Sequence, residues 1–215
     1  SMNMPWLRLA TLFLILAAVL VATGWLSPAA TLREKPKVPA APRLIRLGDE
    51  ALSVTAESAL ITRLRTGETL YARSADVRLL IASLTKLMSA LLLAEESQPL
   101  AEIEFSSAAA TIGEPDDKRS DAAAGERFHA EDALKMLLIS SDNDAAYAAA
   151  EYVALLGLEP TASFPERISA FVARMNERAA GLGLADTHFA NPAGSDDPEN
   201  YSTAADLARL AAAIT

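Results

Sequence analysis

A serine and a lysine lie three residues apart at the start of the apolar stretch "IASLTKLMSALLLAEE", residues 81–96. If this stretch is helical, Ser83 and Lys86 share one side, so the hydroxyl can meet the amine. A serine hydroxyl is a poor nucleophile until a base takes its proton, and a lysine can be that base when burial lowers its pKa. If Ser83 lies at the start of a helix, it is also near the positive end of the helix dipole, and its backbone N–H could donate a hydrogen bond to an oxyanion. Taken alone, this spacing is more typical of a serine N-cap followed by a solvated lysine.

A second polar motif, "SSDNDAA" at residues 140–146, contains Ser141, Asp142 and Asn143. S-x-x-K followed by S-D-N and then K-T-G is the signature of penicillin-binding proteins and class A β-lactamases. The same residues are also typical of a helix start, with Asp144 in the first turn. The two interpretations do not exclude each other.

The residues around both motifs resemble one family in particular, the D-alanyl-D-alanine carboxypeptidases and endopeptidases among the low-molecular-mass penicillin-binding proteins. The resemblance extends over residues 56–213 and rests on the strings "TGETLYARSADVRLLIASLTKLMSALLL", "LKMLLISSDNDAAYAAAEYV" and "MNERAAGLGLADTHFANPAGSDDPENYSTAADLARLA". It implies an α+β fold of the penicillin-binding protein and serine β-lactamase type. An antiparallel sheet flanked by helices would lie beside an all-helical lobe that holds Ser141 to Asn143, with the nucleophile between them.

The resemblance also implies a role for each motif residue. Ser83 would be the acylated nucleophile, Lys86 its general base, and Ser141 a proton relay between the amine and the leaving group. Asn143 would bind an amide of the substrate and steady Lys86. The substrate would be the D-Ala-D-Ala end, or a D-amino-acid cross-link, of a peptidoglycan peptide. Hydrolysis would proceed through an acyl-enzyme without a metal or cofactor, and β-lactams would be covalent inhibitors. A class A β-lactamase is disfavoured because the deacylation sequence E-x-x-L-N is absent.

The third motif of the family, K-T-G, is missing, since none of the five lysines precedes Thr-Gly. Arg65-Thr66-Gly67 imitates it but lies before Ser83, where a hairpin turn is expected. The chain is therefore interpreted as the N-terminal part of the domain without its C-terminal strands, either a fragment of a longer product or a natural remnant without catalysis. Two other hypotheses stay open. One is an envelope module that binds peptidoglycan or a partner, and the other is a membrane-anchored structural protein with Ser83 and Lys86 far apart.

Composition argues against several functions. A net charge of −9 disfavours nucleic-acid binding, which needs a basic surface. Without cysteine the chain has no disulfide, thiolate nucleophile or cysteine-ligated zinc. Its two histidines, His129 and His188, lie far apart in the sequence, which disfavours a histidine-based triad and a zinc site.

The first 30 residues are interpreted as a membrane-targeting segment. Residues 9–26 carry no charge and Trp6 and Trp25 bracket them, as in a span of about 18 residues. This pattern favours an uncleaved transmembrane helix over a cleaved signal peptide, for which residues 27–30 offer a site. Residues 31–42 contain three prolines and predict a stiff linker to the domain at residues 43–215. The protein is therefore expected in the bacterial envelope, anchored or secreted at the extracytoplasmic face of the plasma membrane.

Local patterns predict the elements that position the motifs. Thr66-Gly67 between two β-prone runs predicts a hairpin over residues 58–73, and residues 102–105 are typical of a short strand. An exposed loop is expected over residues 111–125, and "NPAGSDDPEN" is rich in turn formers. The predicted helices cover residues 83–95, 130–139, 144–156 and 166–182, and Ser202 or Thr203 caps a last one. Because the missing strands would cover the nucleophile helix, its run "LTKLMSALLL" is expected to face solvent and to leave the domain poorly soluble or partly molten.

Overall fold

A β-hairpin opens the part of the chain that the computed structural model describes, which comprises residues 54–112, 120 and 122–214. β1 (Ala59–Arg63) pairs antiparallel with β2 (Glu68–Arg73). Gly67 in the turn has a φ of +69° and its N–H donates to the Arg63 carbonyl at 2.8 Å. Glycine adopts such a positive φ without steric cost. The predicted hairpin is confirmed, and Arg65-Thr66-Gly67 forms its turn.

The predicted membrane segment, residues 1–30, and the predicted linker, residues 31–42, lie outside the described residues, as does most of the predicted loop at 111–125. Among the helices that are described, none combines the length and the apolar composition that a bilayer span requires.

The predicted helix after residue 83 begins with a different kind of turn. η1 (Ala82–Thr85) is a 3₁₀ turn that runs directly into α2 (Lys86–Glu96). Leucine, alanine and methionine dominate α2, and all three favour the helical conformation. The helix ends at Ser97, whose N–H and hydroxyl both donate to the Leu93 carbonyl.

A lobe rich in helices follows. It contains α3 (Ala130–Lys135), a π-helical turn η3 (Met136–Ser140), α4 (Asn143–Leu155) and α5 (Phe164–Gly181). Asp142 caps α4 by accepting the Ala145 N–H at 2.9 Å, and α4 packs against both α2 and α5. The prediction that this lobe is all-helical is wrong. β4 (Glu102–Glu104) pairs antiparallel with β5 (Arg127–His129), a strand that the sequence did not indicate, and a short 3₁₀ turn η2 (Ala109–Thr111) lies between them in the chain.

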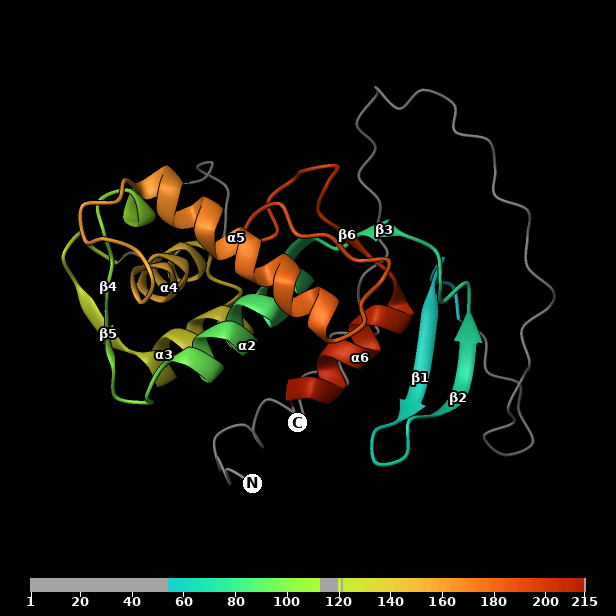
Figure 1. Ribbon diagram of the computed structural model, residues 1–215. Coiled ribbons are helices and arrows are strands. Elements are labelled where there is room, and N and C mark those ends of the chain that lie inside the picture. The colour runs from blue at the N-terminus through green and yellow to red at the C-terminus, as the bar shows by residue number, and fades with distance from the viewer. Residues whose placement is uncertain (1–53, 113–119, 121, 215) are drawn as a thin grey trace.

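Two segments connect this lobe to the hairpin (Figure 1). β3 (Leu79–Leu80) pairs antiparallel with β6 (Tyr201–Ser202), and α6 (Ala204–Ile214) follows at once. The Thr203 hydroxyl accepts the Asp206 N–H at 3.0 Å, so Thr203 is the cap that the sequence allowed. α6 contacts both α2 and β1. The architecture is therefore α+β, as predicted, and within the described residues the strands form three separate antiparallel pairs.

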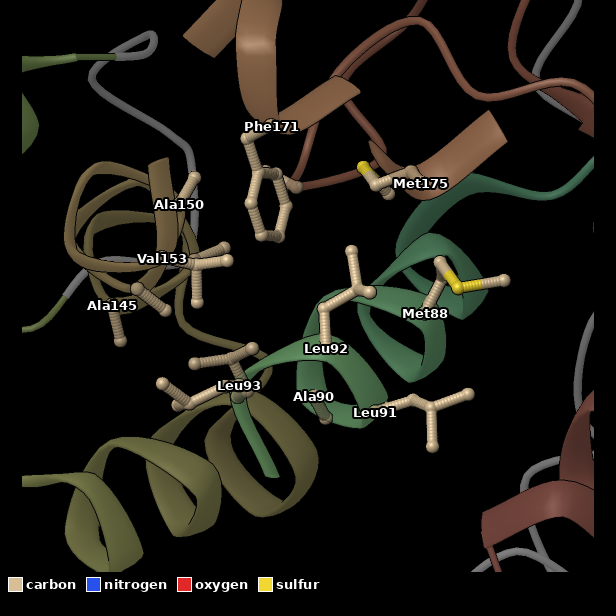
Figure 2. Packing of buried hydrophobic residues seen from close by; sticks show 14 of the residues in the cluster. Met88, Ala90, Leu91, Leu92, Leu93, Ala145, Ala150, Val153, Phe171 and Met175 are labelled. Carbon is tan, nitrogen blue, oxygen red and sulfur yellow. The ribbon is translucent and has the colours of Figure 1, made fainter. Parts of the chain in front are cut away.

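The apolar run of α2 lies in the core. Met88 and Leu93 have no exposed surface, and Figure 2 shows Leu92 directed toward Phe171 and Met175 of α5. The expectation that this run faces solvent is wrong, because helices α4, α5 and α6 contact it from within the chain itself. On α5 the buried residues recur at every fourth position, Phe171, Met175 and Ala179, as an amphipathic helix requires.

Candidate active site

Lys86 is the first residue of α2, and only 2% of its surface is exposed. Its Nζ donates to Ser83 Oγ at 3.3 Å, to Asn143 Oδ1 at 2.7 Å and to the Ala193 carbonyl at 2.6 Å. Burying an amine is costly unless such acceptors replace water. The predicted contact between the serine and the lysine is therefore confirmed. The interpretation of a solvated lysine is wrong, and so is the hypothesis of a structural protein in which the two residues lie far apart.

Ser83 is an exposed residue of the η1 turn. It caps neither η1 nor α2, because no side-chain hydrogen bond caps either element. The preceding residue, Ala82, has a φ of +44°, which is uncommon for a residue with a Cβ atom. Such strain persists only where the surrounding structure imposes it, and it is frequent at functional sites. The strained turn joins β3 to η1 and leaves Ser83 accessible beside a buried amine.

The second motif reaches the same amine from the helical lobe. Asn143 begins α4 and accepts the hydrogen bond from Lys86 Nζ, so its predicted contact with the lysine is confirmed. Asp142 caps the helix and Asp144 lies in its first turn, so the interpretation of this motif as a helix start is confirmed. Ser141 is half-buried at the end of η3 with a φ of +57°. Its part as a proton relay stays a prediction.

The third acceptor on Lys86, the carbonyl of Ala193, was not predicted. It lies in the turn-rich string "NPAGSDDPEN", which the sequence indicated only as an irregular connection. A backbone carbonyl has no residue type of its own, so the sequence holds no direct signal for this contact. Ser89, one turn further along α2, also donates to this loop, at the Pro192 carbonyl with a distance of 2.7 Å.

A charged and aromatic cluster supports the strand that leads to Ser83. Arg78 Nε and Nη2 donate to Asp186 Oδ1 at 3.0 and 2.7 Å, and the guanidinium lies 5.0 Å from the centre of the Tyr201 ring. The hydrogen bond to Asp186 raises the pKa of Arg78 above its ordinary value. Tyr201 in turn pairs with Leu80, three residues before Ser83. Because an exposed ion pair adds little stability, the main effect of this cluster is to fix the direction of β3.

The geometry is suited to acyl transfer. An accessible hydroxyl beside a buried amine can attack a carbonyl carbon while the amine takes its proton. Over residues 54–112, 120 and 122–214, no group of three or more histidine, aspartate or glutamate side chains could hold a metal ion.

Known proteins share this combination of fold and sequence. The family described as D-alanyl-D-alanine carboxypeptidase matches residues 46–215. The chain is 35% identical to the D-alanyl-D-alanine endopeptidase of Pseudomonas aeruginosa over 156 residues, which cover 71% of this chain and 45% of that protein. It is 33% identical to the D-alanyl-D-alanine carboxypeptidase DacF of Bacillus subtilis, over 74% of this chain and 39% of that protein. The chain thus spans less than half the length of these two relatives.

Solved structures give the same result for the fold. The D-alanyl-D-alanine carboxypeptidase DacD from Francisella tularensis superimposes with a TM-score of 0.67 at 30% identity, over 79% of this chain and 38% of that one. The DD-transpeptidase of Streptomyces K15 superimposes with a TM-score of 0.68 at 27% identity, over 76% and 62% of the two chains. The predicted α+β fold of the penicillin-binding type is therefore confirmed at the level of the family.

Proposed function

Since the chain belongs to the D-alanyl-D-alanine carboxypeptidase family, we propose that it carries the nucleophile and the base of a serine-type peptidase. The substrate is a peptidoglycan peptide that ends in D-Ala-D-Ala or contains a D-amino-acid cross-link. The observation that supports this most directly is the buried Lys86 amine, which contacts both Ser83 Oγ and Asn143 Oδ1. A lysine that served only solubility would not be enclosed in this way.

The proposed reaction has two halves. In the first, Ser83 Oγ attacks the carbonyl carbon of the D-Ala-D-Ala bond while Lys86 takes the hydroxyl proton. Ser141 then passes this proton from Lys86 to the leaving amine, so that the C–N bond breaks and an ester forms on Ser83. In the second half, water attacks this ester while Lys86 takes a proton from the water. Lys86 returns this proton to Ser83 Oγ as the C–O bond breaks, and the peptide leaves as the free acid. The Ser83 N–H stabilises the oxyanion in both halves, and Asn143 holds an amide of the substrate together with the amine of Lys86.

The same chemistry makes β-lactams covalent inhibitors, because opening of the lactam ring leaves an ester on the same serine. The substrate assigns the protein to the cell envelope. We place residues 43–215 at the extracytoplasmic face of the plasma membrane, with residues 1–30 as the anchor, since residues 9–26 carry no charge.

Covalent labelling with a fluorescent penicillin tests this function on the complete product of the reading frame that encodes these residues. We expect one label for each protein molecule, and none for Ser83→Ala. Ser97→Ala is the matched control. It removes a serine at the other end of α2, whose hydroxyl bonds the Leu93 carbonyl of the same helix, so labelling should continue at the wild-type rate.

Equal labelling of Ser83→Ala and the wild type would overturn the role of Ser83. A wild-type protein that binds peptidoglycan sacculi but never labels would instead favour the non-catalytic envelope module. For a protein that does label, release of free D-alanine from a pentapeptide distinguishes carboxypeptidase action from cleavage of cross-links.

A further inference from the structure

The turn-rich loop at residues 191–200 lies along one side of residues 82–89, which form η1 and the start of α2 and are the nucleophile segment of the proposed function. The loop contacts this segment at residues 82, 85, 86 and 89. Residues with this spacing lie on one face of a helix. Three of these contacts are hydrogen bonds. Asn200 Nδ2 donates to Thr85 Oγ1 at 2.8 Å, Lys86 Nζ donates to the Ala193 carbonyl at 2.6 Å, and Ser89 Oγ donates to the Pro192 carbonyl at 2.7 Å. The loop is therefore shaped to fit this face.

The fourth contact, at residue 82, is a close approach between the backbone at Gly194 and the backbone of Ala82 and Ser83. Gly194 has a φ of +83°, and a Cβ atom there would lie 2.0 Å from the Ala82 carbonyl oxygen and 2.9 Å from the Ser83 nitrogen. Only glycine permits this contact. The loop thus presses against the peptide group that joins Ala82 to Ser83, and this peptide group carries the N–H assigned to the oxyanion.

One side chain holds the loop in this shape. Asn191 Oδ1 accepts three successive backbone N–H groups, from Ala193 at 3.2 Å, Gly194 at 2.7 Å and Ser195 at 3.0 Å. Its Nδ2 donates to the Ser195 carbonyl at 3.0 Å. Asparagine is suited to such a turn because its amide bonds the nearby backbone. The direction of the Ala193 carbonyl and the position of Gly194 both depend on these bonds.

We infer that Asn191 is a positioning residue for the Ser83 and Lys86 pair. In its neutral form Lys86 has two N–H groups and one lone pair. The Asn143 amide oxygen and the Ala193 carbonyl can only accept. When each takes one N–H, the lone pair can be directed toward Ser83 Oγ, which lies 3.3 Å from Nζ. By fixing the Ala193 carbonyl, Asn191 sets the direction in which the base acts. This inference rests on the proposed function.

The test compares acylation by a fluorescent penicillin in the complete product of the reading frame. Asn191→Ala removes the acceptor of all three N–H groups, whereas Asn191→Asp keeps an acceptor oxygen. For Asn191→Ala we expect the acylation rate at saturating penicillin to fall about tenfold or more, since small displacements of reacting groups are costly. The penicillin concentration for half-maximal rate should stay the same, and Asn191→Asp should recover most of the loss.

Asn176→Ala is the matched control. Asn176 also bonds backbone groups with its amide, at Phe189 and Val172, and none of these bonds reaches residues 82–89. It should lose stability without a change in acylation rate. If Asn191→Ala does not fold, Ser89→Ala removes an anchor of the same loop from the helix side and should give the same loss of rate.

The outcomes separate the two claims. A wild type that never labels overturns the proposed function, and this inference with it. A wild type that labels while the folded Asn191→Ala or Ser89→Ala variant acylates at the same saturating rate overturns only the inference. A fall of equal size in Asn176→Ala would also overturn it, because the effect would then be one of general stability.

Discussion

At the scale of single residues, the environment of Lys86 decides how its chemistry should be interpreted. A lysine that is 2% exposed carries a free-energy cost unless it is hydrogen-bonded or loses its proton. Here two carbonyl-type oxygens and the Ser83 hydroxyl surround the amine. A leucine at this position would avoid the cost of burying an amine, but it would remove the donor of the hydrogen bonds to Asn143 and Ala193. These contacts agree with the role of general base that is proposed for Lys86.

Lys86→Arg separates charge from basicity. Arginine keeps the cation but cannot lose a proton in a protein, so the base is lost. We expect penicillin acylation to slow by about a hundredfold or more, within the range that general base catalysis supplies. Stopped-flow or gel-based labelling over time measures the rate, and circular dichroism checks the fold. Lys135→Arg, at an exposed lysine paired with Asp132, should label normally. Equal rates for Lys86→Arg and the wild type would show that the lysine is not the base.

The sequence predicted the side-chain part of this site and missed its backbone part. Ser83, Lys86 and Asn143 have types and spacings that indicate chemistry, and the structure brings all three together. The Ala193 carbonyl and the close approach of Gly194 were missed, since a contact made by the backbone leaves no residue type to detect. The strained φ of Ala82 was missed for the same reason, because it is imposed by tertiary contacts rather than by local preference.

At the scale of elements, long periodic segments were predictable and short ones were not. The helices α2, α4, α5 and α6 each match a predicted segment, because a run of apolar residues with caps defines a helix over several turns. β3 and β6 have two residues each, too few for an alternating pattern to appear. Their pairing joins segments that lie far apart in the sequence, and Arg78 contacts Asp186 and Tyr201 beside it. The π-helical turn η3 likewise depends on its tertiary context.

The start of α5 gives a prediction about pH. Ser163 and Glu166 form a capping box, in which the Glu166 carboxylate accepts the Ser163 hydroxyl at 2.6 Å and its backbone N–H at 2.7 Å. The hydroxyl bond, followed by the backbone bond, lowers the pKa of Glu166 below its ordinary value. A carboxyl group with a lowered folded-state pKa stabilises the fold above its unfolded pKa and loses this contribution as the pH falls through the folded value.

Glu166→Gln removes this dependence while it keeps the capping geometry. At neutral pH we expect the wild type to have a slightly higher melting temperature, because the charge also favours the helix N-terminus. The difference should shrink as the pH falls below about 4.3, the ordinary glutamate pKa. Thermal unfolding of both proteins across pH 7 to 3 measures it. A difference that stays constant over this range would show that the carboxylate charge plays no part.

At the scale of the whole molecule, the core and the site share one helix. α2 directs Leu92 toward α5 (Figure 2) and buries Met88 and Leu93, and its first residue is Lys86, the proposed base. Packing of this helix therefore determines the position of the amine as well as the stability of the domain. Its burial was not predictable from the sequence alone, because the α4 and α5 residues that cover it are brought there only by the fold.

Leu93→Ala tests whether this core holds without further strands. Leu93 has no exposed surface, and deleting a fully buried leucine side chain commonly costs about 2–5 kcal/mol of unfolding free energy. We expect residues 43–215 to unfold in urea in one cooperative transition, and Leu93→Ala to lower the midpoint without a change in slope. Leu100→Ala, at a leucine that is 68% exposed, should leave the midpoint almost unchanged. Circular dichroism follows both transitions. If instead the protein melts gradually and Leu93→Ala matches Leu100→Ala, then the apolar run of α2 faces solvent in solution, as the sequence first indicated, and the position of Lys86 would have to be fixed by its own hydrogen bonds alone.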